Sequence, residues 1–317
     1  MASIDIHLFG KFSIACNDQI LECLKSQKAQ ELFCYLILFR DRIHYRESLA
    51  DLLWRDQGKS QARKYLRKTI WQLQNELERI PQMEENSMIQ IDANWIQFTT
   101  ASKISIDVIV LENAFKFVKG VRGFDFDNQH VQTIKDAMRC YYGDLLEGCY
   151  ADWCIYERER LKEIYLMLIG KLLNYCQANY MNDDSLIDEG ILLSHKILSY
   201  EPTHERTHAS LMLFHYLLGD RTTALHQYEH CKTILKEELD VEPSNRTFLL
   251  YQQIKNDDLY DQSYNNGSKI NDEKSSVAKR FSRIKSLLET QKAIYLQLPR
   301  EIQELEDDIS GLVNNRK

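Results

Sequence analysis

The sequence predicts a chain in three parts: an α+β N-terminal region, an all-α region of paired helices, and a coiled-coil-like tail. Three observations predict this organisation. Strand-like alternation, three helical patterns and a β-hairpin signal follow one another within residues 1–100. Helical patterns joined by short loops fill residues 101–256. A heptad pattern occupies residues 275–317, after a polar segment at 257–274 that has the composition of a flexible linker.

Length and composition limit the classes of protein. At 317 residues the chain exceeds a typical single core, and its 44% apolar and 27% charged residues are typical of a soluble globular protein. No apolar run approaches the ~20 residues that span a bilayer. The eight cysteines include no CxxC pair, which favours reduced thiols over a disulfide framework or a zinc site. We therefore expect a cytoplasmic protein without a membrane partner.

The first strands are predicted from alternation of apolar and polar residues. Residues 4–8 alternate, Gly10 permits a turn, and residues 12–14 return as the second strand of a short hairpin. Residues 20–24 are expected to add a third strand.

Three helices and a hairpin follow. Ser26 is the expected N-cap of a helix with apolar residues at helical spacing, and a second, short helix covers Arg46–Trp54. The third helix lies within Gly58–Arg79. Two apolar runs at residues 88–91 and 95–98 then flank the turn residues Asp92-Ala93-Asn94, which is a β-hairpin signal.

The third helix has an apolar stripe and a strongly basic opposite face. No acid occurs between Gln57 and Asn75. The stripe contains Ala62, Leu66, Thr69, Ile70, Leu73 and Leu77, and the opposite face contains Ser60, Arg63, Lys64, Arg67, Lys68, Trp71 and Gln74, with Lys59 at the helix start. A solvated face is the alternative, but neighbouring like charges are unfavourable unless they meet a polyanion.

The net charge of −7 is compatible with nucleic-acid binding because it is unevenly distributed. Residues 1–100 carry 13 cations and 13 acids, so the whole excess of acids lies in the remainder of the chain. The local field around a basic helix matters more than the total charge.

The N-terminal region resembles a known family of DNA-binding domains. The segments LFGKFSI, KAQELFCYLILFRDR, RESLADLLW and ARKYLRKTIWQLQNEL are similar to the winged helix of SARP/AfsR/DnrI-type regulators, which resembles the OmpR/PhoB class. The resemblance covers about residues 3–100. It implies that the third helix enters the major groove of double-stranded DNA while the hairpin reaches a minor groove.

Roles follow from side-chain chemistry on that face. Arg63, Arg67 and Gln74 are the expected contacts to base edges. Lys59, Lys64 and Lys68 are expected at phosphates, and Asn94 at the hairpin tip is expected at the DNA backbone. Ser60, on the same face, is also expected to contact DNA. Trp71 is interpreted as packing against another protein surface rather than on DNA.

Residues 101–256 predict stacked antiparallel helices, as in TPR arrays. The expected helices are Val108–Val118, Trp153–Tyr180 and Leu186–Tyr200, one opened by Pro202 and ended at Gly219, and two opened by Arg221 and by Pro243-Ser244. The segment LSYEPTHERTHASLMLFHYLLGDRTTALHQYEHCKTILKEELDVEPSNRTFLLYQQI resembles the bacterial transcriptional activator domain of the same regulators. Gly219 is expected at positive φ and Asp220 as the cap of the next helix.

Two HxxxH pairs, His204/His208 and His226/His230, have a spacing that can bind metal. We interpret them as hydrogen-bonded core residues, and we expect no metal site and no cofactor. No GxxxxGK[ST], GxGxxG or GxSxG motif is present, so we expect no enzyme and no catalytic residue.

The tail predicts either a homodimer through a coiled coil or a helix packed back on the helical region. Self-association is the favoured alternative, although Pro299 must bend or divide the helix. The seam residues expected at the dimer interface are Phe281, Ile284, Leu288, Leu298, Ile302, Leu305, Ile309 and Leu312.

The leading functional hypothesis is a DNA-binding transcriptional regulator, which the resemblance implies is an activator that contacts RNA polymerase. The helical region is the expected receiver of a signal, either a small molecule or a peptide. The alternative is a helical-repeat ligand sensor or adaptor whose winged domain contacts protein rather than DNA.

Overall fold

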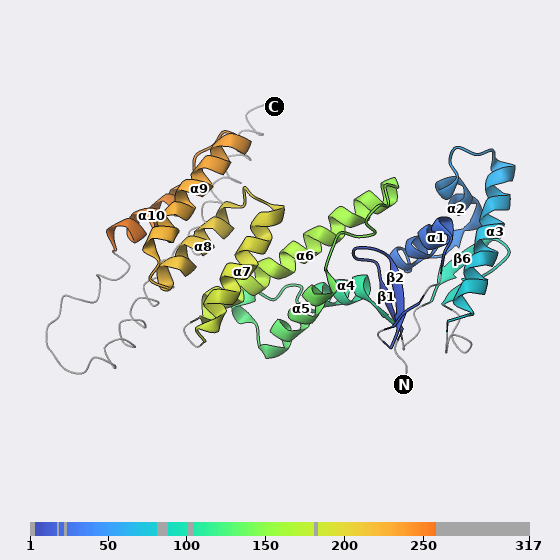
Figure 1. Ribbon diagram of the computed structural model, residues 1–317, viewed down its shortest axis with the longest axis horizontal. Helices are drawn as coiled ribbons and strands as arrows, with labels where there is room; N and C mark the ends of the chain where they lie inside the picture. The colour runs from blue at the N-terminus through green and yellow to red at the C-terminus, as the bar shows by residue number, and fades with distance from the viewer. Residues whose placement is uncertain are drawn as a thin grey trace, which may run out of the picture. The chain divides into compact units, whose positions relative to one another are not determined.

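The computed structural model places most of the chain in two compact units, Met1–Tyr175 and Cys176–Lys317. A small α/β region comes first and a mostly helical region follows (Figure 1), as the sequence predicts at this level. The structure describes residues 4–17, 19–21, 24–80, 88–99, 104–180 and 183–257. The predicted linker beyond Asp257 and the predicted tail at 275–317, with its seam residues, lie outside the described residues.

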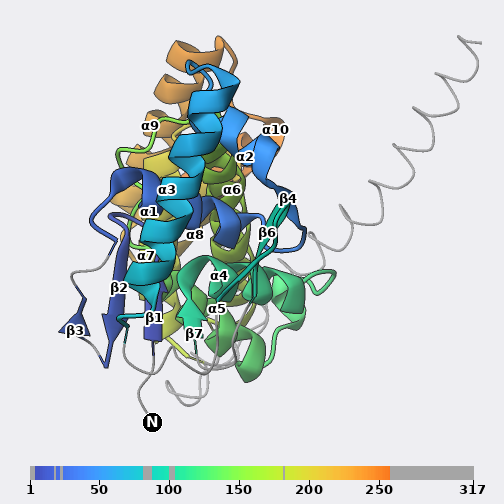
Figure 2. The same cartoon turned by 90° about the vertical axis from the view of Figure 1, so that its right-hand side faces the viewer.

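The first sheet has the strand order β3-β2-β1-β7 (Figure 2). Its strands are β1 (Ile4–His7), β2 (Ser13–Cys16), β3 (Gln19–Ile20) and β7 (Ile104–Ile106). β1 pairs antiparallel with β2 and parallel with β7. The third strand differs from the predicted 20–24: it begins at Gln19, Leu21 lies outside it, and Leu24 adopts a φ of 54°, outside the extended region. Residues 22 and 23 of the predicted strand lie outside the described residues.

Three helices and a second sheet follow in the predicted order. The helices are α1 (Gln27–Leu38), α2 (Arg46–Leu53) and α3 (Lys59–Leu77). The second sheet has the order β4-β6-β5, from β4 (His44–Tyr45), β5 (Ile89–Ile91) and β6 (Trp95–Phe98). β5 and β6 are the two arms of the predicted hairpin.

The predicted N-cap role of Ser26 at the start of α1 is confirmed for its position but not for its side chain. Ser26 occupies the predicted N-cap position, and its carbonyl accepts hydrogen bonds from the amides of Ala29 and Gln30 at 2.9 and 3.0 Å. Its side chain, however, makes no capping bond to the described residues. The helix is held instead by burial, because its residues from Leu32 to Leu38 are all buried.

Asp107, the first residue of α4 (Asp107–Phe117), holds the end of β1. One carboxylate oxygen accepts from the amides of Leu8 and Phe9 at 2.7 and 2.9 Å, and the other accepts from the amide of Val108 at 2.7 Å. Burial raises the pKa of Asp107 to about 6, although these three backbone hydrogen bonds act in the opposite direction. The sheet and the first helix after it are therefore joined through a single buried carboxyl group.

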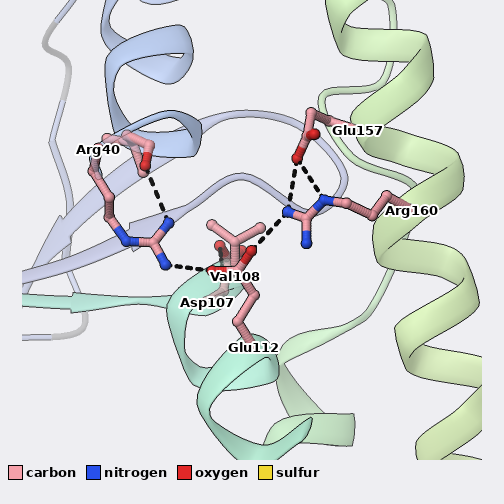
Figure 3. Close-up of polar contacts among 7 residues, drawn as sticks. Arg40, Asp107, Val108, Glu112, Glu157 and Arg160 are labelled. Atoms are coloured by element: carbon pink, nitrogen blue, oxygen red, sulfur yellow. Dashed lines mark hydrogen bonds and ion pairs between the residues drawn. The ribbon is translucent and has the colours of Figure 1, made fainter. Parts of the chain in front are cut away.

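Glu112, on the same helix, connects α1 with α6 (Asp152–Asn179) through two guanidinium groups (Figure 3). Its carboxylate pairs with Arg40, which follows α1, and with Arg160 of α6, whose Nη2 lies 2.6 Å from Glu112 Oε1. Arg160 also pairs with Glu157 at 2.7 Å. The side chains of Glu112 and Arg40 are only 12% and 11% exposed, so the pair is largely removed from water. Burial raises the pKa of Glu112, but the hydrogen bonds from the two arginines outweigh it and lower the pKa overall.

The loop before α6 adds a third attachment to the N-terminal sheet. The amide of Gly10 donates to the carbonyl of Asp144 at 2.7 Å, and the amide of Leu146 donates to the carbonyl of Leu8 at 2.8 Å. A short 3-10 helix (Gly123–Asp125) and α5 (Asn128–Cys140) complete this unit.

In its described residues, the second unit contains the end of α6 and four further helices. These are α7 (Ser185–Tyr200), α8 (Glu205–Leu217), α9 (Arg221–Leu239) and α10 (Asn245–Asn256). A Cβ on Gly190 of α7 would lie 2.4 Å from the Phe214 ring of α8, so this close helix pair requires glycine. Met212, Tyr216, Ala224, Tyr228 and Ile254 form a buried cluster among α8, α9 and α10.

Most of the helix ends predicted for this unit are confirmed. Gly219 adopts a φ of 82° between α8 and α9, and the Asp220 side chain accepts from the amide of Thr223 to cap α9. The helix predicted to open at Pro202 begins at Glu205 instead, because the amide of His204 bonds back to Glu201 and closes a turn first. Among the helices of the described residues, none is long and apolar enough to cross a membrane.

Replacing Glu112 by Gln is expected to lower the free energy of unfolding of the first unit by about 3 kcal/mol. The value is at the low end for a broken buried ion pair, because Arg160 is partly exposed. Urea denaturation measures it. The matched control is Glu159→Gln, which breaks the more exposed pair with Lys162 and should cost less than about 0.5 kcal/mol. Equal losses in the two variants would contradict this role for Glu112.

The raised pKa of Asp107 should make the free energy of unfolding depend on pH. Its pKa in the folded chain, about 6, lies above the ordinary value of 3.8, so the folded state binds the additional proton. The stability that Asp107 contributes is therefore complete below about pH 4 and falls, by about 3 kcal/mol, as the pH rises through 6. We expect the difference in unfolding free energy between the wild type and Asp107→Asn to decrease over this range. A difference that increases with pH would contradict the assignment.

Candidate nucleic-acid interface

The apolar stripe predicted for α3 is the face that the fold buries. Its members, Ala62, Leu66, Thr69, Ile70, Leu73 and Leu77, are all buried. This face packs against α1 and α2, so the opposite face of α3 is directed to solvent.

All of the predicted DNA-contacting residues are exposed. On α3 these are Lys59, Ser60, Arg63, Lys64, Arg67, Lys68 and Gln74, and Asn94 is exposed at the tip between β5 and β6. Trp71 lies on the same face of α3 and is 63% exposed. The exposed residues of α3 are therefore mostly basic and polar, and they include the aromatic side chains of Tyr65 and Trp71.

Most of this positive charge is uncompensated. Arg63 pairs with Glu47 of α2 at 2.5 Å, but both side chains are exposed, at 57% and 73%. Within the part of the chain that the structure describes, Lys59, Lys64, Arg67 and Lys68 form no ion pair. An exposed pair such as Arg63–Glu47 contributes at most about 1 kcal/mol, so Arg63 can exchange Glu47 for another anion at small cost.

The start of α3 adds a backbone contribution. Its N-cap is Gly58, around whose Cα the space is open, and the first helical residues, Lys59 and Ser60, are exposed. The first amides of a helix point along its axis and carry the positive end of the helix dipole. An anion at this end meets both these amides and the Lys59 ammonium group.

The β5–β6 hairpin is fixed beside α2 by Arg46. The amide of Arg46 donates to the carbonyl of Asn94 at 2.9 Å. Its guanidinium donates to the carbonyls of Asp92 and Ala93 at 3.3 and 3.2 Å. β4, immediately before α2, also pairs with β6. The hairpin tip and α3 are thus both attached to α2, which sets their separation.

Sequence reasoning did not identify two residues of this arrangement. Arg46 shows only as the first residue of a short helix, and Glu47 only as one acid among several. Their roles depend on contacts with the hairpin and with α3, 46 and 16 residues away along the chain. No sequence motif with a fixed spacing marks either contact, so the sequence alone does not reveal them.

The histidine pairs behave unequally. His208 is buried, and its two ring nitrogens contact the carbonyl of Pro202 at 2.8 Å and the amide of Gln227 at 2.5 Å. It is a hydrogen-bonded core residue, as predicted. That interpretation is wrong for His204, His226 and His230, which are exposed rather than part of the core. His204, at the N-cap of α8, nevertheless contacts the hydroxyl of Thr207 at 2.7 Å. The described residues contain no group of three or more His, Cys, Asp or Glu placed to hold a metal ion.

A family match identifies the helical region. Residues 125–255 match the family described as bacterial transcriptional activator domain. The match runs from the 3-10 helix at Gly123–Asp125 into α10. It confirms the resemblance to the activator domain of SARP-type regulators in the part of the chain where the sequence predicts it. No curated protein matches the sequence.

The fold is similar to that of a solved structure, Mycobacterium tuberculosis EmbR in complex with a low-affinity phosphopeptide. The TM-score is 0.65 at 16% sequence identity, and the alignment covers 91% of this chain and 72% of that chain. The similarity therefore extends beyond the matched domain to the N-terminal α/β region that carries the basic helix.

Proposed function

We propose that this chain, whose residues 125–255 form a bacterial transcriptional activator domain, is a sequence-specific DNA-binding regulator of transcription. The observation that carries the proposal is the exposed face of α3, where four cations lack an ion-pair partner among the described residues. In this proposal the N-terminal region is a winged helix, α3 enters the major groove of duplex DNA, and the β5–β6 hairpin is the wing.

The side chains on α3 divide into two groups by chemistry. Arg67 and Gln74 have the donor geometry for base edges, arginine for guanine and glutamine for adenine. Arg63 joins them once DNA replaces Glu47 as its partner. Lys59, Lys64 and Lys68 bind phosphates and fix the position of the helix, as Ser60 does near the helix start. Asn94, held at the wing tip, contacts the DNA backbone.

The activator domain has a separate role in this proposal. We assign it the task of contacting RNA polymerase or of receiving a small-molecule or peptide signal, in a cytoplasmic protein that acts as a homodimer through its C-terminal tail. Two copies would double the number of phosphates neutralised and steepen the salt dependence of binding.

One observation favours the alternative in which the N-terminal region contacts protein. Trp71 is 63% exposed in the middle of the basic face, and exposed tryptophan is enriched at protein interfaces. The two functions differ in their response to salt, because only binding to DNA releases a counterion for each phosphate that is neutralised.

Single substitutions on α3 should separate phosphate contacts from base contacts. Lys64→Ala is expected to weaken binding to all DNA sequences and to reduce the slope of log K against log salt by about 1. Arg67→Ala is expected to cost about 1–3 kcal/mol at the preferred site and to relax specificity there. Fluorescence anisotropy with labelled duplexes over a salt series measures both quantities.

The matched control is Lys116→Ala, which removes an exposed cation from α4 rather than from α3. It should leave both the affinity and the slope unchanged. If the three variants shared one slope and one affinity, α3 would not be the DNA-binding helix.

A further inference from the structure

Two cysteines lie together at the start of α6, away from the basic face of α3. Cys149, in the loop before the helix, is partly exposed, whereas Cys154, in the first turn, is fully buried. Both are free thiols, and each lies close enough to the other to shift its pKa. One residue of the pair is therefore partly open to solvent, and the other is enclosed by protein.

Arg158, one helical turn after Cys154, fixes this arrangement. Its Nη2 donates to the carbonyl of Cys149 at 3.0 Å and lies 3.9 Å from the sulfur of Cys154. Its other hydrogen bonds go to the carbonyls of Leu145 and Leu146 in the same loop, at 2.9 and 3.0 Å. The guanidinium thus holds the loop with Cys149 against the helix with Cys154.

The two thiols differ in acidity. Contact with Cys154, assisted by the amide of Ala151 and the charge of Arg158, lowers the pKa of the Cys149 thiol despite partial burial. Contact with Cys149, together with burial, raises the pKa of Cys154. A thiolate is the reactive form of cysteine, and reactive cysteines lie in partly exposed, electropositive sites near helix N-termini. Cys149 meets each of these conditions.

We propose that Cys149 and Cys154 are a peroxide-reactive thiol pair, in which hydroperoxides oxidise Cys149 and Cys154 resolves it as an intramolecular disulfide. The Cys149 thiolate attacks the terminal oxygen of the hydroperoxide, the O–O bond breaks, and an alcohol or water leaves. Sulfur is oxidised to a sulfenic acid and the peroxide is reduced. The sulfur of Cys154 then attacks Cys149, the S–O bond breaks, the S–S bond forms, and the thiol proton leaves with the hydroxyl group as water.

Oxidation of Cys149 makes the subsequent attack by Cys154 easier. The pKa of Cys154 is raised first by its side-chain contact with Cys149, then by burial and by the charge of the Cys149 thiolate, and this charge disappears when Cys149 becomes a sulfenic acid. The Cys154 thiol then loses its proton more readily while its sulfur already lies beside its target. In a reducing compartment a disulfide of this kind is a transient, redox-responsive state rather than a structural bond.

Other cysteines serve as internal controls. Cys16 and Cys140 are also partly exposed, but neither has a cysteine partner among the described residues. Burial raises the pKa of Cys140, so this thiol is mostly protonated at neutral pH. We expect Cys149 to react with peroxide on the order of tenfold faster than Cys140, because its thiolate fraction is larger.

Peptide mapping of the full chain tests the proposal. The reduced protein is treated with an equimolar amount of hydrogen peroxide at neutral pH, alkylated, and digested with a protease that cleaves before aspartate and with trypsin. Cleavage before Asp144 and Asp152 separates Cys149 from Cys154, and cleavage after Arg158 separates Cys154 from Cys176. We expect peptides 144–151 and 152–158 to be recovered joined, two hydrogen atoms lighter than their sum.

Two variants assign the roles. In Cys154→Ala, Cys149 should stop at a sulfenic acid that dimedone traps. In Cys149→Ala, Cys154 should escape oxidation and be recovered in its alkylated form, because the buried thiol has lost its more accessible partner. Circular dichroism verifies folding of both variants, and the wild-type map decides the question if either fails to fold. Unlinked, alkylated peptides in the wild type, or equal oxidation of Cys16, Cys140 and Cys149, would overturn the proposal.

Discussion

A single buried carboxylate, Glu112, determines how the N-terminal elements are combined. It is shared by Arg40, which follows α1, and Arg160 of α6, so it links α1 and α4 with α6. A buried carboxylate without these partners would be strongly destabilising, which makes the three segments mutually dependent. Asp107 acts in the same way between α4 and the first sheet. Both carboxylates lie within the first compact unit, Met1–Tyr175.

This constraint has a functional implication. The activator-domain match begins at residue 125, inside the unit that carries α3. The basic face and the first helices of the activator domain are therefore parts of one packed body rather than two bodies joined by a linker. Within it, Arg46 sets the position of the hairpin and Glu47 holds Arg63 until a stronger anion replaces it. The Cys149–Cys154 pair lies in the same body, next to Trp153, whose ring packs against Tyr35 of α1.

Features with a local cause were predictable from the sequence. The buried stripe of α3 follows from helical periodicity, and Gly219 and Asp220 follow from the chemistry of helix ends. Contacts between distant segments were not predictable. β7 pairs with β1 although most of the sequence of the first unit lies between them. Glu112 contacts Arg40, 72 residues away in the sequence, and Arg63 contacts Glu47 on another helix. The exposed set of residues on α3 was predictable as a surface, because amphipathicity marks the solvent side of a helix. The attachment of the hairpin through Arg46 was not, because it depends on the folded hairpin.

The most direct measurement of the central claim is selection of bound fragments from random genomic DNA, with the full chain and an Arg63→Ala/Arg67→Ala variant compared. The two arginines lie on the solvent face of α3, so their loss should leave the fold intact, which circular dichroism verifies. The account predicts that the full chain enriches a repeated sequence motif and that the variant does not. Enrichment of the same motif by both proteins, or of none by either, would contradict the assignment of α3 as the helix that recognises DNA.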